Sequence, residues 1–270
     1  MRDLSVLIDD NGSFIDESQN ARDFLRDPIA LNIVAAEDFI YVGLYKKFNS
    51  IYAEVNDSTA ASSISFEFSN GSGFSALDVR DDTKAFSRSG FVKWERDQES
   101  WIEQNVNGET LFWIRLSFGA DFTANLSGLN LVFSDDNDLR QVQRDIDDFK
   151  FKGDASFIAY HVGAREEIIQ SLRNSGYTTR LNSNPKEDLT QWDILNIEQI
   201  NNAAKYLTLS NIMFDVSTNE DDKYYQKWRD YKGMFGESFK LYLLWLDTNN
   251  NGKLDEQEQN FNRNTRLFKV

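Results

Sequence analysis

The chain has 270 residues and a mass of 31.2 kDa, enough for two ordinary domains or one large β domain. Its net charge of −15 and isoelectric point of about 4.5 exclude a stable electrostatic grip on nucleic acid or on an anionic membrane. The absence of cysteine excludes disulfides, zinc–thiolate sites and cysteine nucleophiles. No apolar run approaches the roughly 20 residues of a membrane span and no signal-peptide pattern opens the chain, so we expect a soluble protein.

The first half of the sequence consists of short runs rich in aromatic and β-branched residues, with apolar positions that tend to alternate. This pattern predicts strands, and turn sequences such as Asn11-Gly12 and Asn107-Gly108 separate them. The predicted strands cover residues 4–8, 31–35, 39–45, 51–55, 64–68, 74–79, 86–94, 111–118 and 129–133. Strands at this spacing indicate an antiparallel β-sandwich rather than a βαβ arrangement.

Three tryptophans, Trp94, Trp101 and Trp113, follow one another closely in the middle of this half. Each ring can bury roughly 150–250 Å², so the first interpretation is that together they anchor the core of the sandwich. A second interpretation is a flat aromatic platform that binds a sugar.

Five short motifs follow one another along this half: Asp38-Phe-Ile-Tyr-Val-Gly43, Lys47-Phe48-Asn49, Asp82-Thr83, Phe86-x-x-Ser89-Gly90 and Phe112-Trp113-Ile114-Arg115. In these motifs the chain resembles β-sandwich modules found in structural proteins of tailed bacteriophages. The resemblance covers about residues 35–135 and concerns core and turn residues, without a reactive group.

The composition changes at the acidic run 134–138, after which the apolar periodicity shifts from two to about 3.6 residues. We place the domain boundary there, with a β-sandwich domain in residues 1–135 and a helical domain in residues 136–270. Residues 139–149 are expected to form a charged helix or linker. From residue 155 a helix is predicted, with an apolar stripe at Phe157, His161, Ala164, Ile168 and Leu172.

Three helix starts are predicted further along the chain. Asp188-x-x-Gln191 and Asn196-x-x-Gln199 resemble N-caps with a polar partner three residues on, and they predict a short helical turn and then a helix through residue 213. Thr218, followed by acidic residues, predicts a helix that runs to about residue 246. Its aromatic stripe is apolar enough that we expect burial on more than one face, against neighbouring helices or another subunit.

Residues 247–258 match the calcium-binding loop of an EF-hand at every defining place. Gly252 supplies the sharp turn at the sixth place, and Leu254 is the apolar anchor at the eighth. The candidate metal ligands are Asp247, Asn249, Asn251, Lys253 through its carbonyl, Asp255 and Glu258. The loop has no partner loop, so we expect weak, structural Ca²⁺ binding. An empty turn rich in Asp and Asn and a regulatory sensor are the alternatives.

His161 is the single histidine, and its place on an apolar stripe predicts a buried, hydrogen-bonded side chain rather than a catalytic base. With one histidine, no cysteine and no Gly-x-Ser-x-Gly element, the sequence offers no recognisable triad. We therefore expect a protein without enzymatic activity and without catalytic residues.

The second half contains Tyr160-His161, Ala164-Arg165 and Asn202-Ala203-Ala204 on its predicted helices. In these residues and in the order of the helices, about residues 136–270 resemble the head-to-tail connector, or adaptor, proteins of tailed phages. The resemblance implies a small helical bundle with a short extended C-terminal tail. It also implies a ring of about twelve copies that docks under the portal.

Together these observations predict an α+β protein of two domains that serves as a structural component of a tailed-phage particle. The expected role is a neck or adaptor ring that continues the DNA channel, and the expected place is the virion after synthesis in the host cytoplasm. Its partners would be copies of itself, the portal and neighbouring neck or tail proteins, with DNA only as passing cargo. The alternative is a calcium-dependent carbohydrate-binding or adhesion protein in a tail, baseplate or capsid decoration. A metal-assisted hydrolase has no base or nucleophile to support it.

Overall fold

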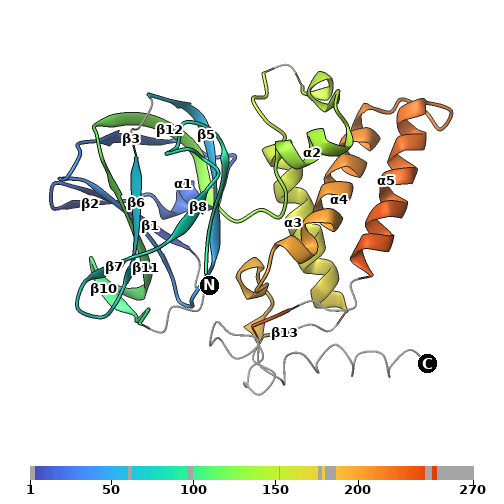
Figure 1. Ribbon diagram of the computed structural model, residues 1–270. Helices are drawn as coiled ribbons and strands as arrows, with labels where there is room; N and C mark the ends of the chain where they lie inside the picture. The colour runs from blue at the N-terminus through green and yellow to red at the C-terminus, as the bar shows by residue number, and fades with distance from the viewer. Residues whose placement is uncertain are drawn as a thin grey trace. The chain divides into compact units, whose positions relative to one another are not determined.

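The computed structural model describes residues 4–59, 63–95, 100–151, 153–175, 178–179, 187–240 and 245–247 (Figure 1). The chain divides into two compact units, Met1–Leu131 and Val132–Val270, called here the first unit and the second unit. The class is α+β, with two antiparallel sheets in the first unit and most of the helices in the second. None of the described helices combines the length and the apolar character that a membrane crossing requires.

The larger sheet of the first unit has the strand order β2-β1-β4-β11-β6-β7, with β10 paired to β11. Its strands are β1 (Ser5–Asp10), β2 (Ser13–Asp16), β4 (Phe39–Leu44), β6 (Ile64–Ser69), β7 (Phe74–Ala76), β10 (Gln104–Val106) and β11 (Glu109–Phe118). The predicted turns are confirmed, because Asn11-Gly12 joins β1 to β2 and Asn107-Gly108 joins β10 to β11. All four turn residues have positive φ, which the type I′ hairpin requires.

The smaller sheet of the first unit has the strand order β3-β12-β5-β9-β8 (Figure 1). Its strands are β3 (Ile29–Ile33), β5 (Ser50–Ser58), β8 (Val79–Asp81), β9 (Gly90–Trp94) and β12 (Phe122–Asn130). The short helix α1 (Ser18–Arg22) lies against β1 and β12. Just beyond α1, Phe24 packs on Gly128 so closely that a Cβ atom at Gly128 would lie 2.5 Å from the ring.

The three tryptophans form part of the buried core, which confirms the first interpretation of the sequence. Trp94, Trp101 and Trp113 are 7%, 1% and 0% exposed. The ring of Trp101 contacts Phe48 at 5.4 Å and Phe112 at 6.1 Å between ring centroids. Because all three rings are covered, they offer no flat surface to a sugar, which corrects the second interpretation.

Three of the predicted strands differ from the observed ones. The predicted strand 74–79 is divided between β7, which ends at Ala76 in the larger sheet, and β8, which begins at Val79 in the smaller sheet. The run 86–94 forms a strand only from Gly90, because residues 84–86 have positive φ in a turn where the Asp81 carboxylate accepts the N–H groups of Thr83 and Ala85. The last strand is β12, which ends at Asn130, so the prediction of a strand at 129–133 is largely wrong. The apolar side chains of residues 131–133 are buried, although these residues lie outside any strand.

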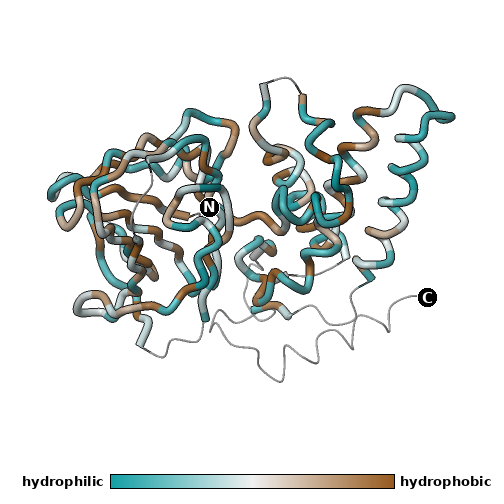
Figure 2. Tube along the Cα trace, turned by 45° about the horizontal axis from the view of Figure 1, so that its top comes forward, coloured by the Kyte–Doolittle hydropathy of each residue, from teal (hydrophilic) through white to brown (hydrophobic). Residues whose placement is uncertain are grey.

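The second unit is mostly helical in the described residues. Its helices are α2 (Asp136–Val142), η1 (Ile146–Phe149), α3 (Ile158–Asn174), η2 (Gln191–Asp193), α4 (Glu198–Val216) and α5 (Lys223–Phe239), with the small hairpin β13 (Thr178–Thr179) and β14 (Glu187–Asp188). A core cluster of the unit consists of Leu139, Ile146, Phe157, Leu209, Ile212, Met213 and Tyr231. Figure 2 shows α5 as largely hydrophilic, in contrast to the strands of the first unit.

Four details of the predicted helices need correction. The N-caps of α4 and α5 are Ile197 and Asp222 rather than the predicted Asn196 and Thr218. The N-cap box of η2 is formed by Thr190 and Asp193, not by Asp188 and Gln191, because the Asp193 carboxylate accepts from both the N–H and the hydroxyl of Thr190. The helix predicted to reach residue 246 ends at Phe239. Leu246 instead pairs with Ile194 in an isolated β-bridge.

Candidate functional site

Of the six predicted calcium ligands, the described part of the chain includes only Asp247. It is buried, and its N–H donates to the carbonyl of Asp193 at 2.8 Å, directly after the bridge between Ile194 and Leu246. The remaining ligands, Asn249, Asn251, Lys253, Asp255 and Glu258, lie outside the described residues. Among described residues no group of three or more His, Cys, Asp or Glu side chains could hold a metal. The calcium site therefore stays a prediction whose first ligand is anchored next to η2.

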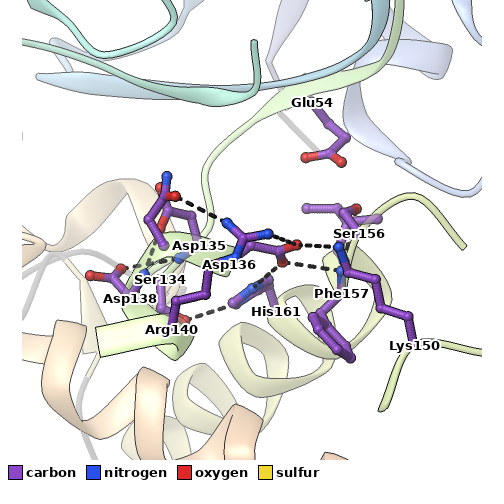
Figure 3. A network of polar contacts seen from close by, with 12 residues as sticks. Glu54, Ser134, Asp135, Asp136, Asp138, Arg140, Lys150, Ser156, Phe157 and His161 are labelled. Carbon is purple, nitrogen blue, oxygen red and sulfur yellow. Dashed lines mark hydrogen bonds and ion pairs between the residues drawn. The ribbon is translucent and has the colours of Figure 1, made fainter. Parts of the chain in front are cut away.

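Within the described residues, a cluster of hydrogen bonds and ion pairs lies at the start of the second unit and centres on Asp136 (Figure 3). One carboxylate oxygen accepts the N–H of Phe157 at 3.1 Å and lies 3.3 Å from Nε2 of His161. The other lies 3.3 Å from the ammonium of Lys150 and 3.7 Å from the guanidinium of Arg140. One side chain in the first turn of α2 thus ties together α2, the segment after η1 and the start of α3.

His161 joins this cluster to Ser134 through its second ring nitrogen. The Oγ atom of Ser134 lies 2.9 Å from Nδ1, and both side chains are almost fully buried. Since an ionised carboxylate can only accept, Nε2 carries the proton toward Asp136, and in the neutral imidazole Nδ1 accepts from the Ser134 hydroxyl. The predicted buried, hydrogen-bonded histidine is confirmed.

Electrostatics explain how Asp136 stays ionised inside the cluster. Burial raises the pKa of its carboxyl, but the hydrogen bond from His161 opposes this effect. The N–H of Phe157 and the ammonium of Lys150 add to that opposition, and the net result is a lowered pKa of Asp136. The cluster is therefore built around a negative charge.

Neighbouring carboxyl groups are shifted in both directions. Burial raises the pKa of Asp135, the N-cap of α2, and the nearby carboxylate of Asp138 raises it further. By contrast, the hydrogen bond from Arg140 holds the pKa of Asp147 far below its ordinary value. In return, that bond raises the pKa of Arg140.

Ser134, His161 and Asp136 are the residue types of a hydrolytic triad, a grouping that the sequence did not reveal because no local motif contains them. Their environment does not suit that chemistry. A nucleophilic serine must reach a substrate carbonyl, whereas Ser134 is 1% exposed. The contacts instead fix the entry of the chain into the second unit, since Ser134 and Asp136 lie on either side of the α2 N-cap.

No protein-family model and no curated protein matches this chain.

A second feature is the aromatic side of α5, called here the α5 flank and comprising Tyr225, Trp228, Arg229, Lys232 and Phe239. The rings of Trp228 and Tyr225 lie 4.7 Å apart between centroids, and the ammonium of Lys232 lies 5.1 Å from the centre of the Trp228 ring. Phe214 of α4 reaches the same ring at 5.3 Å and is 52% exposed.

The prediction that this helix is buried on more than one face stays a prediction, because it includes residues 241–244, which lie outside the described residues, and packing against another subunit. Tyr231 is the only buried residue of α5, and the aromatic residues of the α5 flank are half-buried. The described part of the chain thus leaves an apolar helix side partly open to solvent.

On the first unit, the larger sheet carries aromatic rings that are already engaged. The guanidinium of Arg115 lies between the rings of Phe39 and Phe74, at 4.9 and 4.4 Å from their centres. It also pairs with Glu67 at 2.7 Å. Desolvation of Tyr41 by burial raises its pKa, and the hydrogen bond with Arg115 partly opposes that rise. The rings of Phe39 and Phe74 are thus already in contact with a guanidinium of the same sheet.

Proposed function

We propose that this chain is a non-enzymatic structural component of a tailed-phage particle, specifically a neck or head-to-tail adaptor protein. The observation that carries the proposal is the half-buried aromatic flank of α5 together with the exposed Phe214. A partly exposed apolar face rimmed by charge marks an interaction surface. An assembly protein needs such a surface. In the cluster of Ser134, His161 and Asp136, by contrast, the serine and the histidine are buried.

The proposal includes two domains, a β-sandwich followed by a small helical bundle with a short extended C-terminal tail. The two antiparallel sheets and the buried tryptophans of the first unit support the sandwich. Of the positions that resemble phage modules, Gly43 and Trp113 are buried in this core, and the partly buried Phe112 contacts Trp101.

The proposed partners are copies of the same chain in a ring, of about twelve by the family resemblance, with the portal above and neck or tail proteins below. The net charge of −15 supports DNA as passing cargo, because carboxylates along a channel repel phosphates and leave the duplex free to slide. The chain would be made in the host cytoplasm and incorporated into the virion.

We propose that the loop 247–258 holds one Ca²⁺ weakly, as a structural staple for the C-terminal tail. Supporting this role, the backbone of Asp247 is fixed to Asp193 in the folded unit. Calcium prefers six to eight oxygen ligands, which the six candidate residues can supply together with water.

The decisive experiment is co-expression with the portal protein encoded by the same genome, followed by sedimentation and electron microscopy. The expected result is a ring of this chain on the portal ring, and mass spectrometry of purified particles should detect the chain. Its absence from both portal complexes and particles would refute the proposal. Binding to glycans in place of the portal would favour an adhesion role.

A further inference from the structure

Helix α5 has a charge opposite to that of the rest of the protein. Its seventeen residues include four basic residues and two acidic ones, on a chain with a net charge of −15. The first unit, in contrast, has 21 acidic and 11 basic residues in its sequence. A basic element on an acidic protein is an electrostatic complement to the protein's own surface.

Two of the four basic residues of α5, Arg229 and Lys232, lie on the same side of the helix as Tyr225, Trp228 and Phe239. With about 3.6 residues per turn, the members of the α5 flank fall within less than a third of the circumference. Asp230 and Glu237 fall on a different side of the helix. Gly236 lies among the flank residues with open space around it, so a partner can approach the backbone there. The flank therefore combines aromatic surface, two cations and no carboxylate.

A matching acidic surface exists on the hairpin formed by β1 and β2. Residues 4–21 contain no lysine or arginine and four carboxylates, Asp9, Asp10, Asp16 and Glu17. β2 is an edge strand of the larger sheet, and its Ile15 is 47% exposed. The hairpin and the residue that follows it thus carry an exposed apolar side chain and four carboxylates, which complement an aromatic flank with Arg229 and Lys232.

We infer that the α5 flank of one copy docks on the β1–β2 hairpin of a second copy. Because the two surfaces differ, the contact is head-to-tail, and repeating it produces a closed ring or an open filament. The inference rests on the proposed function only for the closure of these contacts into a ring.

Charge argues against two other occupants. Residues 259–270 of the chain contain Arg263, Arg266 and Lys269 and no acidic side chain, so a basic flank repels them. Nucleic acid would have to approach a protein of net charge −15, which opposes its binding.

The test is sedimentation velocity of the full-length chain at low and high salt, with charge-reversal variants. Wild type is expected to self-associate at low salt and to dissociate as salt rises. Lys232→Glu and Asp16→Lys should each weaken association by at least about tenfold. The matched control is Lys223→Glu, which makes the same charge change on an exposed position on another side of α5 and should behave like wild type. Circular dichroism checks that each variant is folded.

Mixing the two variants provides the sharper result. Lys232→Glu keeps an intact hairpin and Asp16→Lys keeps an intact α5 flank, so an equimolar mixture should regain association that neither variant shows alone. A folded wild type that stays monomeric at low salt, or equal losses in Lys232→Glu and Lys223→Glu, would overturn the inference. DNA binding that Lys232→Glu abolishes would assign the flank to nucleic acid instead. A monomeric chain found in phage particles would overturn the docking and leave the proposed function standing.

Discussion

Replacing Asp136 by alanine tests whether the polar cluster holds the second unit together. The side chain is 13% exposed, and its removal leaves the N–H of Phe157 and Nε2–H of His161 without their acceptor. Each buried donor left unsatisfied costs about 1–3 kcal/mol. Lys150 and Arg140 contribute little to the loss, because both retain Asp147 as a partner at 2.9 and 2.7 Å.

The expected loss of stability for Asp136→Ala is therefore about 2–5 kcal/mol. A loss of about 3 kcal/mol lowers the melting temperature of a unit of this size by roughly 10 °C. Asp136→Asn keeps an acceptor oxygen but no charge, so its loss should be about half as large. Urea denaturation followed by circular dichroism at 222 nm measures the helical unit directly.

The matched control is Asp148→Ala, which removes the same charge from an exposed carboxylate of η1. That variant should stay within about 0.5 kcal/mol of wild type. Equal stabilities of Asp136→Ala and Asp148→Ala would show that the cluster contributes nothing, and the reasoning from buried donors would fail.

Three further predictions concern the core, pH and calcium. Gly43→Ala should cost about 1–3 kcal/mol in a denaturation experiment, since the new Cβ would lie 2.4 Å from the buried ring of Trp113. The folded state lowers the pKa values of Asp136 and Asp147, so the stability that their charges provide is present above about pH 4 and is lost as pH falls through their folded-state pKa values. Urea titrations between pH 5 and pH 2.5 should show this decline in stability. The decline should be smaller in Asp136→Asn. Millimolar Ca²⁺ should release or absorb heat in calorimetry, and Glu258→Gln should abolish this signal; a silent wild type contradicts calcium binding.

Local chemistry explains which parts of the fold the sequence could predict. Asn11-Gly12 and Asn107-Gly108 specify their turns through residues that tolerate positive φ. The buried tryptophans follow from ring size and spacing. The prediction misplaces the last strand of the first unit, because residues 131–133 are apolar and buried without forming a strand. A short apolar run looks the same in the sequence whether or not it forms a strand.

The polar cluster lay beyond sequence reasoning for a different reason. Ser134 and Asp136 approach His161 only because α2 folds back onto the start of α3, and no spacing of 25 or 27 residues encodes that approach. One signal was available: a single histidine on an apolar stripe needs polar partners when buried. The run at 134–138 supplies two of these partners, Ser134 and Asp136.

The contacts of Ser134 and Asp135 determine where the chain can be divided for separate expression. A cut after residue 135 would remove the Ser134 hydroxyl from Nδ1 of His161 and would deprive α2 of the Asp135 side chain that caps it. A cut after Leu131 leaves both interactions with the helices they serve. Two fragments that differ by only four residues at the junction should therefore differ in whether the C-terminal fragment folds.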